Sequence, residues 1–283
     1  MIKIAVPNKG SLSEDAIRLV SEAGYKCKRY SSELAIFDSN NDIEFYFLRP
    51  RDIAIYVGNG FLDLGITGRD LSIDSNTPVQ ELLQLNFGQS SFYYAVPHDS
   101  NLTPDDFEGK RIATSYPHIV EIDMNKRGLK THIIKLDGAV EISIKLGVAD
   151  VIADVVQSGR TLIEAGLKTV GTPILKSEAI VIARSGEQKI QSEIADLFIK
   201  RLKGIVVARE FVIVEYDIPK NTLSQACTIT PGIEAPTISP LSNENWVAIK
   251  AMVKKSEMNS IIDKLSDIGA KGIIVTDIRT CRI

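Results

Sequence analysis

The residues between 151 and 161 carry the most visible chemistry in this sequence. Val151 to Val156 is typical of a buried strand, and the polar run Gln157-Ser158-Gly159-Arg160-Thr161 follows, ahead of an expected helix. Backbone N–H groups at a helix start, a glycine, hydroxyls and an arginine can together bind a phosphate group. Asp154, on the strand just before them, could hold ribose hydroxyls or a metal-bound ligand. The alternative is a plain strand–turn–helix with a capping hydroxyl.

Cations follow two other strands near the N-terminus. Lys9 stands beside a glycine in Pro7-Asn8-Lys9-Gly10, and Arg49 and Arg51 flank a proline directly after an apolar run. An ammonium or a pair of guanidinium groups at strand ends can hold polyphosphate oxygens. The alternatives are a surface lysine in a loop and a solvated helix start.

Three weaker signals also follow expected strands. A glycine turn precedes Asp70, a polar stretch contains Ser90 and Ser91, and Asp137 and Glu141 are four residues apart. The four-residue spacing would place Asp137 and Glu141 on one helix face, where the simplest interpretation is a pair of solvated carboxylates.

Several classes of protein are excluded. The 283 residues carry a net charge of -3, which disfavours a general nucleic-acid or membrane-surface binder. No apolar run is long enough to span a bilayer, and the N-terminus lacks the pattern of a signal peptide. The three cysteines form no close pair, and no histidine is paired in sequence with a nucleophile. A cytoplasmic protein with reduced thiols and no catalytic triad is therefore expected.

The expected elements divide the chain into three parts. Alternating strands and helices predict two α/β lobes, each with an open, mostly parallel sheet and loops at the carboxyl ends of the strands. The last part has the order βαββαβ, which is typical of a ferredoxin-like domain. The expected domains are lobe I at 1–90 with a return segment at 177–210, lobe II at 91–176, and a C-terminal domain at 211–283.

Taken together, six segments resemble one family, the long form of ATP phosphoribosyltransferase with its C-terminal regulatory domain. These segments span most of the chain in the order that the family shows. They are Ala5-Val-Pro-Asn-Lys9-Gly10, Phe47-Leu-Arg49-Pro-Arg51-Asp52-Ile-Ala, Gly65-Ile-Thr-Gly68-Arg69-Asp70, Leu136-Asp-Gly-Ala-Val-Glu141-Ile, Leu146 to Thr161, and Thr230-Pro-Gly-Ile-Glu-Ala-Pro-Thr237.

The resemblance implies a fold and a set of site residues. The fold would be a two-lobed, periplasmic-binding-protein-like catalytic part followed by the ferredoxin-like domain. Lys9, Arg49 and Arg51 would face pyrophosphate or triphosphate oxygens. Residues that would bind the phosphoribosyl group are Asp154, Val155, Val156, Gln157, Ser158, Gly159, Arg160 and Thr161. Residues on the nucleotide or ribose side would be Asp70, Ser90, Ser91, Tyr116 and Glu141. A regulatory histidine site would contain Asp217, Ile233, Thr237, Met252 and Gly272.

The implied reaction joins ATP and phosphoribosyl pyrophosphate, with Mg²⁺ on the diphosphate, and begins histidine biosynthesis. Histidine would inhibit a homo-oligomeric enzyme, a dimer or hexamer. Many relatives carry lysine where this chain has Arg51 and arginine where it has Ser11. Two alternatives stay open: a non-catalytic two-lobed sensor, and a phosphoribosyltransferase for another base.

Overall fold

The structure is a computed structural model that describes residues 1–28, 33–156, 159–186 and 192–282. Contacts divide the chain into two compact units, Met1–Ile199 and Lys200–Ile283, and the division falls within helix α7 (Glu193–Glu210). Among the described residues, no helix combines the length and apolar character needed to cross a bilayer.

The first sheet has the strand order β2-β3-β1-β4-β11-β5. Strand β1 pairs in parallel with β3 and β4, whereas β2, β11 and β5 join the sheet antiparallel to their neighbours. The sheet and helices α1 to α3 form lobe I. Its strands are Ile2–Pro7 (β1), Ala35–Asp38 (β2), Ile43–Leu48 (β3), Leu64–Gly68 (β4), Val79–Gln84 (β5) and Ala179–Arg184 (β11), and its helices are Ser11–Glu22 (α1), Pro50–Gly58 (α2) and Arg69–Asp74 (α3).

The second sheet has the order β10-β6-β9-β7-β8 and, with helices α4 to α6, forms lobe II. Strand β7 pairs in parallel with β8 and β9, whereas β6 and β10 are antiparallel to their neighbours. Its strands are Ser90–Pro97 (β6), Arg111–Thr114 (β7), His132–Lys135 (β8), Val151–Val156 (β9) and Leu167–Ser177 (β10), and its helices are the 3₁₀ turn Pro104–Asp106, Pro117–Arg127 (α4), Ile142–Lys145 (α5) and Arg160–Glu164 (α6).

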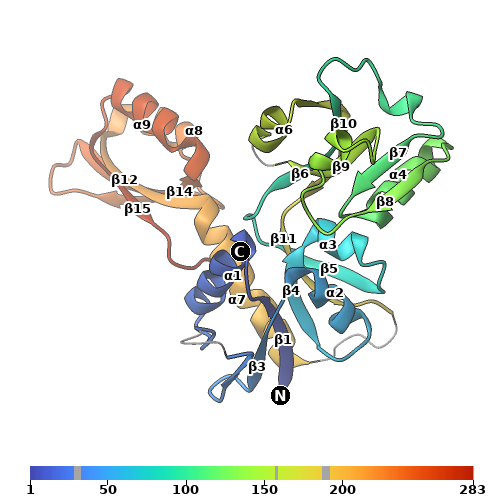
Figure 1. Ribbon diagram of the computed structural model, residues 1–283. Helices are drawn as coiled ribbons and strands as arrows, with labels where there is room; N and C mark the ends of the chain where they lie inside the picture. The colour runs from blue at the N-terminus through green and yellow to red at the C-terminus, as the bar shows by residue number, and fades with distance from the viewer. Residues whose placement is uncertain (29–32, 157–158, 187–191, 283) are drawn as a thin grey trace. The chain divides into compact units, whose positions relative to one another are not determined.

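The two sheets are connected in the same way. Each has three parallel strands, β3-β1-β4 in lobe I and β8-β7-β9 in lobe II, followed by a strand that crosses over from the other lobe. That strand is β6 in lobe II, which follows β5, and β11 in lobe I, which follows β10 (Figure 1). The two-lobed α/β architecture expected from the sequence is confirmed, but the expected mostly parallel sheets are wrong, because both crossing strands and the edge strands β2, β5 and β10 run antiparallel.

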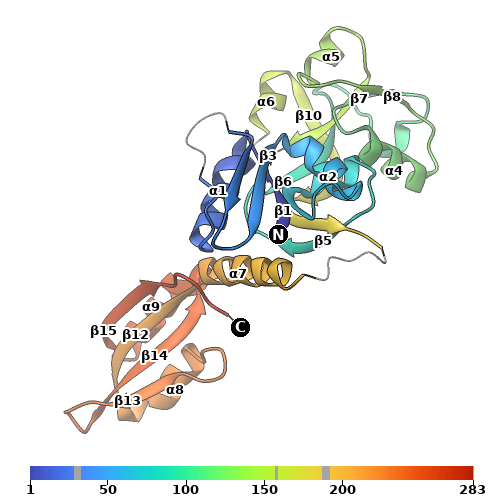
Figure 2. The same ribbon diagram turned by 90° about the horizontal axis from the view of Figure 1, so that it is seen from below.

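Unit Lys200–Ile283 contains an antiparallel sheet of order β13-β14-β12-β15, so the expected βαββαβ, ferredoxin-like domain is confirmed. Helices α8 and α9 cover one face (Figure 1), and Figure 2 shows β13 at an edge beside β14. Alternate residues of β12, such as Val212, Val214 and Tyr216, are buried against these helices. The elements are Phe211–Pro219 (β12), Leu223–Ile229 (α8), Thr237–Pro240 (β13), Trp246–Lys254 (β14), Met258–Asp267 (α9) and Lys271–Asp277 (β15), with 3₁₀ turns at Lys220–Thr222 and Lys255–Glu257.

One local expectation was wrong. Asp137 and Glu141 do not share a helix face, because α5 begins only at Ile142 and Gly138 (φ 130°) and Ala139 (φ 48°) before it have left-handed backbone. At the start of α1, Ser13 lies inside the helix and its hydroxyl donates to the carbonyl of Pro7.

Candidate active site

Lys9 and Arg49 lie side by side because they follow neighbouring parallel strands. Strands β1 and β3 pair in register up to Pro7 and Leu48, and the N–H of Asn8 continues the pairing by donating to the carbonyl of Leu48 at 2.8 Å. Lys9 follows Asn8 at the end of β1, and Arg49 follows Leu48 at the end of β3. Neither Lys9 nor Arg49 has an ion-pair partner among the described residues.

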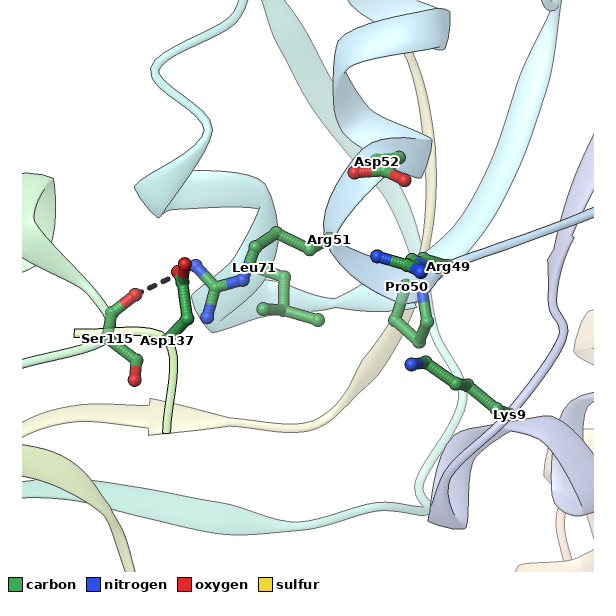
Figure 3. Close-up of a pocket in the computed structure, with 8 residues that line it drawn as sticks. All are labelled: Lys9, Arg49, Pro50, Arg51, Asp52, Leu71, Ser115 and Asp137. Atoms are coloured by element: carbon green, nitrogen blue, oxygen red, sulfur yellow. Dashed lines mark hydrogen bonds between the residues drawn. The ribbon is translucent and has the colours of Figure 1, made fainter. Parts of the chain in front are cut away.

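These cations line a cavity of about 470 Å³ that both lobes border. Arg49 is the N-cap residue of α2, so the side chains of Pro50, Arg51 and Asp52 project from the first turn of that helix. In Figure 3, Lys9 and Arg49 point to one side of the cavity, and Arg51 extends toward Ser115. This cationic cavity is lined by Lys9, Arg49, Pro50, Arg51, Asp52 and Leu71 of lobe I and by Ser115 and Asp137 of lobe II.

Arg51 crosses from lobe I to lobe II. Its guanidinium donates to Asp74 Oδ2 at 3.0 Å and to the carbonyl oxygen of Ser115 at 2.8 Å. The same group lies 4.7 Å from the centre of the Tyr116 ring, a cation–π contact. Arg51 therefore fixes the loop after β7 against α2, and a shorter or less branched cation could not make all three contacts.

Asp70 and Tyr116 meet at the boundary between the lobes. Asp70 is buried and accepts a hydrogen bond from Ser177 Oγ at 2.8 Å, and its carboxylate lies within electrostatic range of the Tyr116 hydroxyl. Burial, followed by the charges of Asp70 and Asp154, raises the pKa of Tyr116. The phenol therefore stays protonated beside the Asp70 carboxylate. Gly68 allows this arrangement, because a Cβ there would lie 2.3 Å from Asp70 Oδ1.

Asp154 lies near the end of β9, within electrostatic reach of several predicted site residues. Burial raises the pKa of this carboxyl group, and Glu141 and Asp70 raise it further, whereas the N–H of Val155 and the charge of Arg51 oppose the rise. The charges of Glu141, Asp70 and Arg51 therefore lie within electrostatic range of Asp154. A carboxylate so placed can offset positive charge that develops on a ribose.

A second cavity, of about 350 Å³, contains three further predicted residues. Ser91 and Val156 are cross-strand partners on β6 and β9, which explains why segments far apart in the chain meet here. The cavity is lined by Arg69, Gln89, Ser90, Ser91, Val156, Lys176, Ser177 and Glu178. Ser177 also bonds to Asp70, which connects this cavity to the lobe boundary.

The expected phosphate-binding loop is described only in part. Gln157 and Ser158 lie outside the described residues. Gly159 has left-handed backbone (φ 70°) and precedes α6, whose first residues are Arg160 and Thr161. Arg160 forms an exposed ion pair with Glu164 at 2.8 Å. Val155 is half-buried in the core of lobe II. A role of this loop in binding phosphate stays a prediction.

In the C-terminal unit, a cavity of about 380 Å³ brings together three of the residues expected at a regulatory site: Asp217, Thr237 and Gly272. Met252 is on the same face of β14 as the cavity residues Lys250 and Ala248, but it does not line the cavity, and Ile233 lies half-exposed in the loop before β13. The cavity lies on the sheet face opposite α8 and α9, because β12 exposes Glu215 and Asp217 there and buries the alternate residues.

Sequence reasoning missed Asp74, Ser115 and Ser177, and interpreted Asp137 as a solvated carboxylate. Each reaches the site through a contact between elements distant in sequence, such as Ser177 with Asp70. Asp137 lies in the loop before α5 rather than on a helix face with Glu141. Ser115 and Asp137 come soon after strands that the sequence predicts, whereas Asp74 and Ser177 have no comparable sequence signal.

Among the described residues, no group of three or more His, Cys, Asp or Glu side chains is placed to hold a metal ion. Magnesium usually binds through one or two carboxylates, waters and substrate phosphates. The carboxylates of Asp52 and Asp137, beside cations that suit a polyphosphate, fit that mode of binding.

The fold and cavities define a two-lobed α/β protein with a cavity lined by cations between its lobes and a ferredoxin-like C-terminal domain. Comparisons with known proteins specify the family. Residues 49–204 match the family model of ATP phosphoribosyltransferase, and residues 208–280 match that of the HisG C-terminal domain. The chain therefore belongs to the ATP phosphoribosyltransferase family and is a transferase of the long form.

Individual relatives agree with this assignment. The chain is 54% identical over 284 residues to the ATP phosphoribosyltransferase of Salinibacter ruber and 53% identical over 283 residues to that of Corynebacterium jeikeium, with all of each chain covered. A solved structure, the ATP phosphoribosyl transferase (HisG:HisZ) complex from Thermotoga maritima, matches 72% of this chain and 97% of its own with a TM-score of 0.63 and 27% identity.

Proposed function

We propose that this enzyme transfers the phosphoribosyl group of phosphoribosyl pyrophosphate to N1 of ATP and releases pyrophosphate, the first step of histidine biosynthesis. The observation that carries the proposal is the cationic cavity: Lys9 and Arg49 have no partner of their own among the described residues, and Arg51 stands beside them. Both proposed substrates carry several phosphates, so cations that are not neutralised by the protein suit them.

The arrangement of residues suits displacement of pyrophosphate. Adenine N1 is weakly basic and needs little activation, so the harder step is the loss of pyrophosphate from C1′ while positive charge develops on the ribose. Lys9, Arg49 and Arg51 would stabilise the departing negative charge. Mg²⁺, carried by the diphosphate, would neutralise part of that charge, with Asp52 and Asp137 placed to bind it or its waters.

The ribose and nucleotide would lie along the lobe boundary. Asp154 and Glu141 would offset the charge of an oxocarbenium-like transition state, and the residues at 154–161 would hold the 5′-phosphate. Asp70, Tyr116, Ser90 and Ser91 would contact the nucleotide or its ribose. Most of the rate acceleration would come from aligning two bound anionic substrates.

We further propose that histidine binds the cavity of the C-terminal unit, with the Asp217 carboxylate on its amino group. Thr237 and Gly272 line the same cavity, and Ile233 and Met252 complete the set that the family resemblance implies. Under this proposal the chain is organised as catalytic lobes at 1–90 with 177–210 and at 91–176, and a regulatory domain at 211–283. It acts in the cytoplasm as a homo-oligomer, with no nucleic-acid or membrane partner.

The decisive assay mixes ATP, phosphoribosyl pyrophosphate and Mg²⁺ and follows pyrophosphate release. Release that requires both substrates supports the proposal, whereas binding without release would favour a two-lobed sensor. Release with another base, but not with ATP, would favour a different phosphoribosyltransferase.

Regulation is tested in the full-length chain with added histidine. Asp217→Asn should raise the histidine concentration for half-inhibition by about tenfold or more, because a buried or half-buried charge pair is lost. Asp277→Asn, which removes the exposed Lys255 ion pair at the far end of the same sheet, is the matched control. Equal inhibition of the Asp217 variant and the control would contradict the assignment of this cavity.

A further inference from the structure

Asp74 connects the two lobes, although it lies outside the residues that the proposed chemistry uses. It ends α3 in lobe I, and its side chain is only 8% exposed. One oxygen, Oδ2, accepts the hydrogen bond from Arg51, and the other, Oδ1, accepts one from the backbone N–H of His118 at 3.0 Å. The N–H of Ile119, the next residue of α4, also lies near this carboxylate and favours its ionised form.

The two N–H groups belong to the first turn of α4, in lobe II. A helix leaves its first N–H groups without partners, and a side chain at the N-cap position usually accepts from them. In α4 the N-cap residue is Tyr116, whose side chain makes no capping bond among the described residues. Asp74 supplies the missing acceptor from the other lobe, and α3 packs against α4.

Nothing in α3 itself explains a carboxylate at this place. A negative charge at the C-terminal end of a helix is disfavoured by the helix dipole, and burial raises the pKa of Asp74, so its environment opposes ionisation. The hydrogen bonds from Arg51 and from the first turn of α4 stabilise the ionised carboxylate and offset the cost of burying it. These partners hold the positions of Ser115 and Tyr116, the two lobe II residues that meet Arg51.

We propose that Asp74 is a positioning residue that sets the spacing of the two lobes across the cleft, by capping α4 from lobe I and by holding Arg51 against Ser115. This inference rests on the proposed function of the cleft. When the lobes separate, Asp74, Arg51 and the first turn of α4 lose their partners together. Substrates that contact both lobes therefore bind the conformation in which these Asp74 contacts are formed. The fraction of the protein in that conformation determines the apparent affinity for both substrates.

Two measurements on the full-length chain test the proposal. The first is hydrogen exchange at the backbone amides of His118 and Ile119, which needs no substrate. Asp74→Ala should accelerate this exchange by about fivefold or more, because the cap is lost. Asp74→Asn keeps an acceptor oxygen and should stay close to the wild-type chain. The matched control is Asp150→Asn, since Asp150 also accepts from an arginine and a backbone N–H, but within lobe II alone.

The second measurement is the kinetics of pyrophosphate release. Asp74→Ala should raise KM for ATP and for phosphoribosyl pyrophosphate together, by about tenfold each, with kcat within about twofold, because one shared equilibrium is shifted. Asp74→Asn should give a smaller rise in both, and Asp150→Asn should change neither. A residue with a merely structural role would lower stability without this paired change in KM.

The outcomes distinguish the capping role of Asp74, its positioning role and the proposed function of the enzyme. Unchanged exchange in Asp74→Ala would overturn the capping role. Faster exchange with unchanged KM values, or a change in KM for one substrate only, would overturn the positioning role. If the wild-type chain releases no pyrophosphate from the two substrates, the proposed function fails, and the exchange experiment still decides whether Asp74 joins the lobes.

Discussion

The polar contact between the Tyr116 hydroxyl and the buried Asp70 carboxylate gives the sharpest stability prediction. Tyr116→Phe removes one oxygen and keeps the ring, which makes an edge contact with Phe92 at 5.3 Å and lies beneath Arg51 at 4.7 Å. A full hydrogen bond to a charged group contributes about 1.5–3 kcal/mol. Because Asp70 keeps its hydrogen bond from Ser177 and its contact with the Tyr116 hydroxyl is looser than a full hydrogen bond, we expect a loss at the lower end, about 1.5 kcal/mol.

The assay can distinguish the two units of the chain. In a unit of this size, each kcal/mol of lost stability lowers Tm by roughly 2–4 °C. Tm of unit Met1–Ile199, followed by far-UV circular dichroism, should therefore fall by about 3–6 °C. The single tryptophan, Trp246, lies in the other unit, so its fluorescence transition should not change.

The control for this experiment is Tyr93→Phe. The hydroxyl of Tyr93 forms no hydrogen bond with the described residues, so its loss should leave the transition unchanged. Equal stability of Tyr116→Phe and Tyr93→Phe would refute the conclusion that the Tyr116 hydroxyl stabilises the fold through its contact with Asp70.

Three further predictions concern activity, packing and pH. Arg49→Ala should lower kcat/KM by about 100-fold, as for loss of one oxyanion donor, whereas Arg111→Ala, at an ion pair outside the cleft, should have little effect. Gly65→Ala should destabilise the chain by about 1–3 kcal/mol in urea unfolding, because the added Cβ would lie 2.4 Å from a methyl group of Ile53. The hydrogen bond from Arg111 lowers the pKa of Asp150 from 3.8 to about 2, so this group stabilises the folded state above about pH 4 and the benefit disappears as pH falls toward 2. Because the pair is partly exposed, the difference from Asp150→Asn between pH 5 and pH 2 should be about 1 kcal/mol or less, and a stability difference that grows as pH falls would contradict this sign.

The sequence determined the parts of the site that follow buried strands. Strands β1, β3 and β9 are short apolar runs that end in polar residues, and such runs can be recognised locally. Parallel pairing of β1 with β3, which the structure shows, then places Lys9 beside Arg49. The same reasoning located the βαββαβ unit, in which buried and exposed residues alternate along β12.

The sequence did not reveal strands β5 and β10. Both are edge strands, half-exposed along most of their length, and β10 also contains Gly171 and Pro173. An edge strand buries little apolar surface, so its residues need not form the apolar run or strict alternation that identifies a central strand. Without these strands, the antiparallel share of both sheets was underestimated.

The contacts between the lobes were decided only by the tertiary structure. Arg51 meets Ser115, Asp74 caps α4, and the Tyr116 hydroxyl lies within electrostatic range of Asp70, and each pair is separated by more than forty residues. Local periodicity shows which face of an element is buried, but not which distant polar group lies opposite it. The sequence by itself therefore determined the types of residue at the strand ends and their likeness to a family, whereas the packing of α3 against α4 decided which of them act together.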